Sequence, residues 1–253
     1  MIPEFWDELP QLVRQLDDSG EARAIVLSSQ GKHFTAGMDL SVFGGSTTLD
    51  TTDGAEIGRQ RANLRRNILR LQETFSCLER ARLPVLAAVQ GGCVGGGVDL
   101  ASACDMRYCT SDAFFCIQEI NIGMTADVGT FPRLPHVMPE GLVRELAYTG
   151  RRLSASEALD CGLVNRVYDS HEAMIAGVGE IAGEIAARSP LAVWGSKEML
   201  NYARDHSIAD GLDYIATWQT GMFQPTDMKE AFQAKSERRD PEFADLLPLG
   251  KKL

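Results

Sequence analysis

Three acidic residues follow the densest glycine cluster of the chain, residues 91–97 (GGCVGGG). They are Asp99, Glu119 and Asp127, and apolar residues flank the first two. A carboxyl group among apolar neighbours loses hydration, which raises its pKa and suits it to proton transfer near neutral pH. A lone acid is more often a helix cap or an ion-pair partner, but three acids around one glycine-rich turn favour a proton-transfer site.

The glycine cluster predicts backbone N–H groups that can hold a negatively charged oxygen. It precedes a short helix and matches neither the GxGxxG pattern nor a Walker phosphate loop. Residues without a Cβ let a ligand approach the backbone, and the dipole of the following helix favours an anion. The cluster is therefore typical of an oxyanion hole, although glycines in this place also serve close packing of a helix on a strand.

The elements around these residues predict an α/β fold, because strand, turn and helix recur in that order. Helical spacing of apolar residues, with Ser154 as an N-cap, predicts helices at residues 5–16, 57–81, 98–104 and 153–161. Short apolar or β-branched segments predict strands at residues 24–29, 84–89, 105–109, 113–117 and 163–168.

The chain divides into two predicted parts. Residues 1–189 are predicted to form the core, and residues 190–253, where strand signals cease, form a helical region with turns near Gln224 and Asp240. Residues 43–54 are rich in Gly, Ser, Thr and Asp and predict a loop.

Charge excludes two classes of partner. The balance of 25 Lys+Arg against 35 Asp+Glu gives a net charge of −10, which argues against nucleic acid or an anionic membrane as the main partner. The basic exception is the helix predicted at residues 57–81, whose arginines form either a solvated face or a local attractor for anions. These arginines are Arg59, Arg61, Arg65, Arg66 and Arg70.

Cysteine and histidine usage indicates no metal site. The six cysteines lie mostly in apolar segments without a CxxC pair, which predicts reduced core thiols, and the four histidines are far apart without an HExxH motif. No leader or membrane-spanning apolar run is recognisable, and the terminal Lys-Lys-Leu lacks the small first residue of the peroxisomal Ser-Lys-Leu signal. We therefore expect a cytoplasmic, bacterial-type protein and not a peroxisomal one.

Four segments together resemble the crotonase (enoyl-CoA hydratase/isomerase) superfamily. They are residues 34–40 (FTAGMDL), 89–100 (VQGGCVGGGVDL), 104–107 (CDMR) and 162–164 (GLV). Within the superfamily, the order Asp99, Glu119, Asp127 is similar to that of the delta-3,5-delta-2,4-dienoyl-CoA isomerases, as is the segment 201–207 (NYARDHS). The resemblance runs over nearly the whole chain.

The resemblance implies a crotonase-like spiral of ββα units followed by a C-terminal α-helical trimerisation region. It implies a homotrimer, or a hexamer built as a dimer of trimers, that acts on an acyl-CoA thioester without a separate cofactor, because coenzyme A is part of the substrate. The N–H groups of Met38 and Gly96 would hold the thioester oxygen. Substrate-binding positions implied beside them are Ala36, Gly37, Asp39 and Gly95.

The third acid decides between two reactions of this superfamily. Hydratases typically have Glu in place of Asp99 and Gly in place of Asp127, whereas a dienoyl isomerase needs two proton-transfer groups spread along the acyl chain. We predict a shift of a 3,5-dienoyl-CoA to a 2,4-dienoyl-CoA, with Asp127 as base and Glu119 as acid, or the reverse. Asp99 would tune the site as a charged neighbour.

Other interpretations remain. The alternative reaction is that of an enoyl-CoA hydratase or another crotonase-type acyl-CoA enzyme, and a different class is a non-catalytic homologue that binds CoA or RNA. The net charge weighs against RNA, and the three acids weigh against an inactive protein. Family members begin with a strand before the first helix, and residues 1–6 (MIPEFW) resemble an internal position, so we expect that strand to be absent.

Overall fold

The structure is a computed structural model that describes residues 1–39, 56–223 and 225–250. The loop predicted at residues 43–54 and the terminal Lys-Lys-Leu lie outside these ranges. The described strands are β1 (Ile25–Leu27), β2 (Val85–Val89), β3 (Gly92–Val94), β4 (Met106–Thr110), β5 (Phe114–Cys116), β6 (Leu153–Ser154) and β7 (Arg166–Tyr168). The helices before Ser189 are α1 (Phe5–Ser19), α3 (Ile57–Arg80), α4 (Gly96–Ala103), α5 (Thr130–Arg133), α6 (Glu140–Thr149), α7 (Ala155–Asp160) and α8 (His171–Ala186). Helices α9 (Pro190–Tyr202), α10 (Ile208–Met222) and α11 (Pro225–Glu237) follow.

Successive turns of the chain place strands in two sheets. One sheet has the order β1-β2-β4-β7 and is entirely parallel, and the other has the order β3-β5-β6. The units β2-β3-α4 and β4-β5-α5 stack in parallel, with β2 beside β4 and β3 beside β5. The predicted ββα spiral is therefore confirmed.

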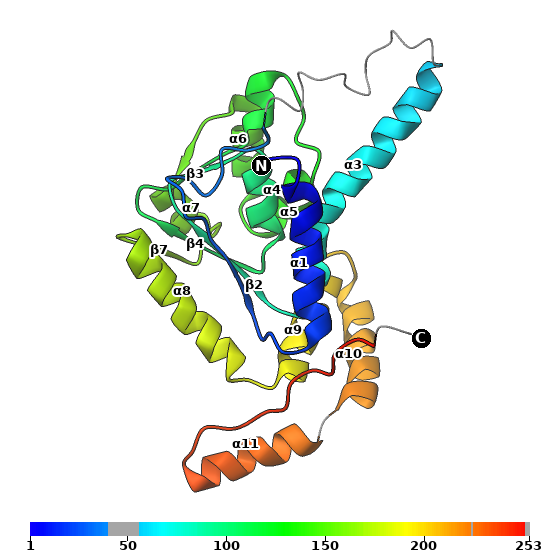
Figure 1. Ribbon diagram of the computed structural model, residues 1–253, viewed down its shortest axis with the longest axis vertical. Coiled ribbons are helices and arrows are strands. Elements are labelled where there is room, and N and C mark those ends of the chain that lie inside the picture. Colours follow the sequence, from blue (N-terminus) through cyan, green and yellow to red (C-terminus); the bar gives the residue numbers. More distant parts are fainter. Residues whose placement is uncertain (40–55, 224, 251–253) are drawn as a thin grey trace.

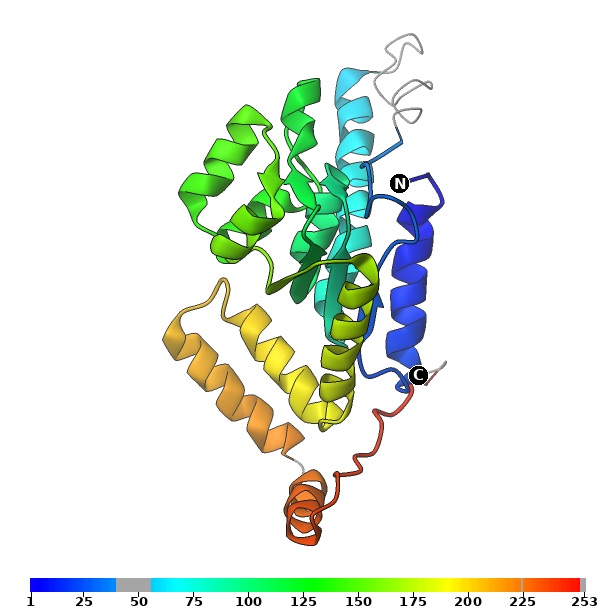
Figure 2. The same ribbon diagram turned by 90° about the vertical axis from the view of Figure 1, so that its left-hand side faces the viewer.

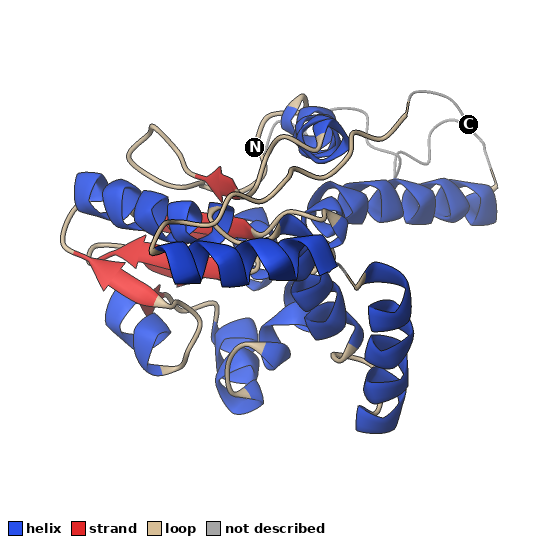
Figure 3. Ribbon diagram, turned by 90° about the horizontal axis from the view of Figure 1, so that it is seen from below, coloured by secondary structure: helices blue, strands red, loops and turns tan. Residues whose placement is uncertain are grey.

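Strand β2 lies at the centre because apolar groups cover both of its faces. All five of its residues are buried, as expected for a parallel strand with helices on both sides. Leu86 and Ala88 pack against Met174 of α8, whereas Val85, Ala87 and Val89 belong to the main core with Phe75 of α3. Helices accordingly lie on both sides of the strands (Figure 3).

Helix α3 confirms the helix predicted at residues 57–81 and is buried only near its C-terminal end. The side chain of Glu56 caps its first turn by accepting from the N–H groups of Gly58 and Arg59. Its first turns project from the body of the molecule (Figure 1), and the arginines predicted on this face are exposed. Arg70 pairs with Asp7 of α1 at 3.0 Å.

The glycine cluster differs from the predicted turn because it contains strand β3. Phe115 pairs with Cys93 of this strand, and the N–H of Thr35 donates to the carbonyl of Gly92 at 3.0 Å on its other side. Gly97 allows the close approach, since a Cβ there would lie 2.4 Å from Cγ2 of Thr35. The segment around Thr35 is thereby held against the start of α4.

The C-terminal end departs most from the sequence-based expectation. Residues 239–250 form no helix, and they run back to the C-terminal end of α1 (Figure 2). Arg23 holds this segment by an ion pair with Asp245 and a 2.7 Å hydrogen bond to the carbonyl of Phe243. Pro241 and Pro248 disfavour a helix there because proline lacks an N–H. Three helices, α5, α6 and α8, were not predicted.

The cysteines are free thiols, as predicted. Five are buried, and burial raises the pKa of Cys77 to about 11 and that of Cys104 to about 12, which makes these thiols unreactive. None of the described helices is long and apolar enough to span a membrane.

We predict that Gly97→Ala destabilises the protein by about 1–3 kcal/mol, because the added methyl group overlaps Thr35. The double variant Gly97→Ala/Thr35→Ser removes Cγ2 and should recover part of this loss in urea unfolding. Gly183→Ala in α8 is the control: its Cβ meets nothing within 4 Å, and alanine favours a helix by up to about 1 kcal/mol. Equal effects of the two alanine substitutions would contradict the close approach.

Candidate active site

Asp99 occupies the first turn of α4 and is completely buried. Its Oδ1 accepts from the N–H of Thr130 at 2.6 Å and from the hydroxyl of Thr130 at 2.8 Å. Its Oδ2 is buried and has no partner in the described part of the chain. Burial raises the pKa of Asp99 to about 6, against the opposing effects of the Thr130 hydrogen bonds and the Arg133 charge.

Glu119 lies in the 3₁₀ helix η2 (Gln118–Ile122), beside the glycine cluster. Its Oε1 is 3.2 Å from the position that a Cβ of Gly95 would take, so the missing side chain leaves room for the carboxyl group. Oε2 is buried without a partner among the described residues. Burial, followed by the charges of Asp99 and Asp127, raises the pKa of Glu119 to about 7.

Asp127 lies in the loop between η2 and α5 and remains accessible to solvent. Partial burial of its carboxyl group raises its pKa. The side chain of Gln72 on α3 donates to the carbonyl of Asp127 at 2.6 Å and holds the backbone of this loop. Asp99 and Asp127 are linked through one loop, because Thr130, three positions after Asp127, binds Asp99. The charges of both acids contribute to the raised pKa of Glu119.

The two predicted oxyanion donors lie in adjacent segments. Gly96 is the first residue of α4, a position whose N–H has no partner within a helix. A Cβ on Gly37 would lie 3.1 Å from the carbonyl oxygen of Val94 and 3.9 Å from Cα of Gly95, so the segment that leads to Met38 passes directly beside the glycine cluster. The role of the two N–H groups stays a prediction.

The remaining predicted substrate-binding positions lie beside the first residue of the chain. The amino group of Met1 donates to the carbonyl of Gly37 at 2.6 Å, and the N–H of Asp39 donates to the carbonyl of Met1 at 3.0 Å. Ala36 and Asp39 are exposed. A cavity of about 360 Å³ borders this segment, and none of the three carboxylates lines it. Its lining residues include Met1, Phe5, Leu27, Thr35 and Leu100.

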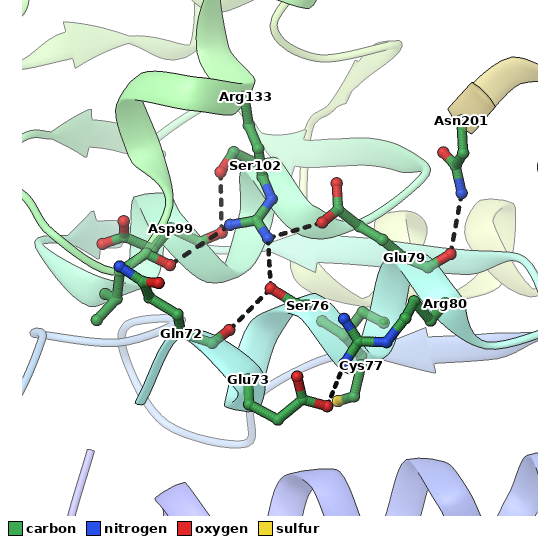
Figure 4. Close-up of polar contacts among 12 residues, drawn as sticks. Gln72, Glu73, Ser76, Cys77, Glu79, Arg80, Asp99, Ser102, Arg133 and Asn201 are labelled. Atoms are coloured by element: carbon green, nitrogen blue, oxygen red, sulfur yellow. Dashed lines mark hydrogen bonds and ion pairs between the residues drawn. The ribbon is translucent and has the colours of Figure 1, made fainter. Parts of the chain in front are cut away.

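Three residues of the site were not predicted from the sequence: Thr130, Gln72 and Arg133. Thr130 orients Asp99. Gln72 and Arg133, which are labelled in Figure 4, hold the loop that carries Asp127. For Gln72 the sequence gives a partial indication: it follows Leu71 of the apolar stripe, so it lies next to the buried face of the predicted helix. Thr130 and Arg133 have no such indication, because neither belongs to a helix or strand that the sequence predicts.

The arrangement suits movement of protons along a chain of carbon atoms. Two carboxyl groups with raised pKa values near one another can be present as one acid and one base close to neutral pH. Within the described ranges, no group of three His, Cys, Asp or Glu side chains is arranged to hold a metal ion.

Known proteins share this architecture. Residues 1–246 match the family described as enoyl-CoA hydratase/isomerase. This chain belongs to the enoyl-CoA hydratase/isomerase family. Among solved structures, an enoyl-CoA hydratase from Bacillus anthracis superposes on it with a TM-score of 0.83 at 28% identity, covering 97% of this chain and 88% of that chain.

Two curated members of the enoyl-CoA hydratase/isomerase family are more similar in sequence. The mitochondrial Delta(3,5)-Delta(2,4)-dienoyl-CoA isomerase of Mus musculus is 46% identical over 237 residues, which cover 93% of this chain and 72% of the mouse protein. The peroxisomal Delta(3,5)-Delta(2,4)-dienoyl-CoA isomerase of Arabidopsis thaliana is 43% identical over 243 residues, covering 96% of this chain and 87% of the plant protein.

The expectation of a cytoplasmic, bacterial-type protein is wrong. It rested on the absence of a recognisable leader and on the poor match of Lys-Lys-Leu to a peroxisomal signal. The mouse and plant relatives are named as mitochondrial and peroxisomal proteins. A targeting signal is read by a receptor and is no part of the packed fold, so the fold carries no trace of it.

We predict that Asp99→Asn changes how stability depends on pH. The folded protein binds a proton at Asp99 up to about pH 6, whereas the unfolded chain releases it near pH 4, so the wild type loses stability as pH rises through this window. Between pH 5 and pH 8, thermal unfolding should shift in favour of Asp99→Asn by about 1 kcal/mol. Asp169→Asn is the control for replacing an exposed carboxyl group. A pH-independent difference for Asp99→Asn would contradict the raised pKa.

Proposed function

We propose that this member of the enoyl-CoA hydratase/isomerase family converts a 3,5-dienoyl-CoA to a 2,4-dienoyl-CoA. The single observation that carries the proposal is the pair Glu119 and Asp127, two neighbouring carboxyl groups whose pKa values are both raised. The names of the mouse and plant relatives support the same substrate class. The reaction would belong to the breakdown of unsaturated fatty acids by β-oxidation.

The chemistry requires one proton to leave and another to arrive farther along the chain. A base removes a proton from C2, next to the thioester, and the C3=C4 and C5=C6 double bonds shift as an acid delivers a proton to C6. Asp127 acts as the base and Glu119 as the acid, or the reverse, since both carboxyl groups have raised pKa values. A pKa of about 7 keeps part of Glu119 protonated at neutral pH.

Charge on the intermediate also needs stabilisation. Removal of the C2 proton places negative charge on the thioester oxygen, and the N–H groups of Met38 and Gly96 are proposed to hold it. Each preorganised donor of this kind contributes about 3 kcal/mol to the transition state. Both donors are backbone groups, so they require the close approach of residues 35–38 to the glycine cluster rather than a particular side chain.

Hydration of an enoyl-CoA is the second candidate. A hydratase places one water molecule between two carboxylates, and the third acid has no task in that reaction. Asp99 uses one oxygen to accept two hydrogen bonds from Thr130 and is fully buried. We therefore assign Asp99 to the electrostatic tuning of its two neighbours.

We predict that Glu119→Gln and Asp127→Asn each lower the kcat of diene isomerisation by about 10²-fold or more, because each removes a proton-transfer group. The assay follows the ultraviolet absorbance of the diene, with hydration of a simple enoyl-CoA measured in parallel. Glu180→Gln on the exposed face of α8 is the control.

The pH profile separates the roles of these carboxyl groups. The wild-type rate should change with an apparent pKa near 7 that belongs to the coupled cluster, and Glu119→Gln should remove this transition. Retention of isomerisation by both carboxyl variants, or faster hydration than isomerisation by the wild type, would overturn the proposal.

We also propose that the chain assembles as a homotrimer, or as a hexamer made of two trimers, through its C-terminal helices. Helix α10 has no buried residue in the single chain, and large apolar side chains are exposed on α9, α10 and α11. The most exposed are Leu200 (71%), Ile208 (84%), Leu212 (64%) and Phe232 (68%). Exposed large apolar side chains of this kind are typical of a subunit interface.

Light scattering of the purified protein tests this assembly. We expect the mass of three or six chains, and we expect Leu212→Glu to shift the protein toward monomers, because a buried charge at an interface is strongly unfavourable. Leu12→Glu on α1 is the matched control, since Leu12 is 56% exposed and lies outside these helices. A monomeric wild type would rule out the proposal.

A further inference from the structure

The side chain of Arg133 lies where the loop that carries Asp127 meets helix α3 (Figure 4). Its Nη2 donates to the hydroxyl of Ser76 at 3.0 Å and to Oε2 of Glu79 at 2.7 Å, and its Nη1 donates to the carbonyl of Val128 at 3.4 Å. The guanidinium group therefore joins the loop to two residues of one helix.

The loop is shaped around this guanidinium group. Gly129 has φ +141°, and a Cβ there would lie 1.6 Å from Nη1 of Arg133, so only glycine fits. The residues on either side of this glycine matter to the site, because Asp127 precedes it by two positions and Thr130, which orients Asp99, follows it directly. The position of Arg133 therefore affects two of the three carboxyl groups.

Helix α3 presents a polar stripe to the loop. Gln72, Ser76 and Glu79 are spaced at i, i+4 and i+7, which places them on one face of the helix. Gln72 donates to the carbonyl of Asp127 at 2.6 Å. Ser76 and Glu79 bind Arg133, which in turn donates to the carbonyl of Val128 in the same loop. A rigid helix thus contacts the loop at successive turns.

The pair of Arg133 and Glu79 is buried, with side chains 10% and 20% exposed. Burial alone would raise the pKa of Glu79, but hydrogen bonds from Arg133 and then Arg204 keep it low and the carboxylate charged. A buried ion pair costs much of its attraction in lost hydration, so stability alone is a weak reason for it. A bidentate-capable guanidinium group does, however, hold a precise geometry.

We propose that Arg133 is a positioning residue for the isomerisation, and that it clamps the Asp127–Thr130 loop to α3 so that Asp127 and Asp99 keep their places beside the substrate. This inference rests on the proposed function for its kinetic consequences. The clamp itself is a property of the folded chain and can be measured without substrate.

The clamp also reaches the C-terminal helices. Oε1 of Glu79 accepts from Arg204 at 2.6 Å, and the carbonyl of Glu79 accepts from the side chain of Asn201 at the end of α9 at 2.9 Å. The glutamate that holds Arg133 is therefore itself held by the region proposed to form the subunit interface.

Two substitutions of Arg133 separate geometry from charge. Arg133→Lys keeps the charge but loses the planar fork, and we expect kcat to fall by about 10-fold to 100-fold with KM little changed. Arg133→Gln also removes the cation that lowers the pKa of Asp99, so the apparent pKa in its kcat profile should differ from that of the wild type, whereas the apparent pKa of Arg133→Lys should not. Hydrogen exchange of the amides at residues 126–130 should be faster in both variants.

Arg82→Lys is the matched control, because Arg82, which follows α3, and its partner Asp17 of α1 are buried to a similar degree, 13% and 17% exposed. It should lower thermal stability as much as Arg133→Lys while leaving kcat and the loop amides unchanged. If the Arg133 variants do not fold, Glu79→Gln keeps an acceptor for Arg133 and should give a smaller loss of kcat with faster loop exchange.

Two results would overturn the inference: a kcat within about twofold of the wild type in Arg133→Lys and Arg133→Gln, or unchanged exchange at residues 126–130. If Glu79→Gln is used in place of the Arg133 variants, a kcat within about twofold of the wild type or unchanged exchange at residues 126–130 would likewise overturn the inference. A wild type that does not isomerise the diene would instead refute the proposed function, and the exchange measurement would then decide the clamp alone.

Discussion

Close contact between backbone segments at the β3–α4 junction is the constraint on which the site depends. Gly97 admits Thr35, Gly37 lies against Val94, and Gly95 leaves space for the carboxyl group of Glu119. A side chain at any of these glycines would push one segment away from the other. The same three contacts therefore bring the two proposed oxyanion donors together and set the distance from them to the acid.

The three buried or partly buried carboxyl groups, in contrast, destabilise the fold. Burial removes water from all three carboxyl groups and raises their pKa values. The charges of neighbouring carboxylates raise the pKa values of Asp99 and Glu119 further. Both effects lower the stability of the folded protein at neutral pH. Thr130 and the buried guanidinium group of Arg133 offset part of this cost around Asp99. Raised pKa values are useful for proton transfer at neutral pH, so the strain of the site and its chemistry have the same physical origin.

Much of the fold could be predicted because local signals agree with the final packing. Residues 84–89 are apolar throughout, and they form the central buried strand β2. Ser154 followed by Glu157 predicts a helix start, and both halves of the capping box are present. The prediction failed for residues 239–250, since a tail held by Arg23 and a few backbone contacts has no periodic pattern to recognise.

The sequence by itself determined the chemistry available: three acids, a glycine cluster that precedes a helix, and a resemblance specific enough to name the family. Tertiary structure alone decided which groups act on one another. Glu119 and Asp127 belong to different elements from Asp99, and Arg133 reaches Glu79 across a gap of 54 positions in the chain. Spacing along a chain reveals contacts within one helix or strand, but contacts between elements depend on how those elements pack, and packing minimises the exposed apolar area of the whole molecule at once.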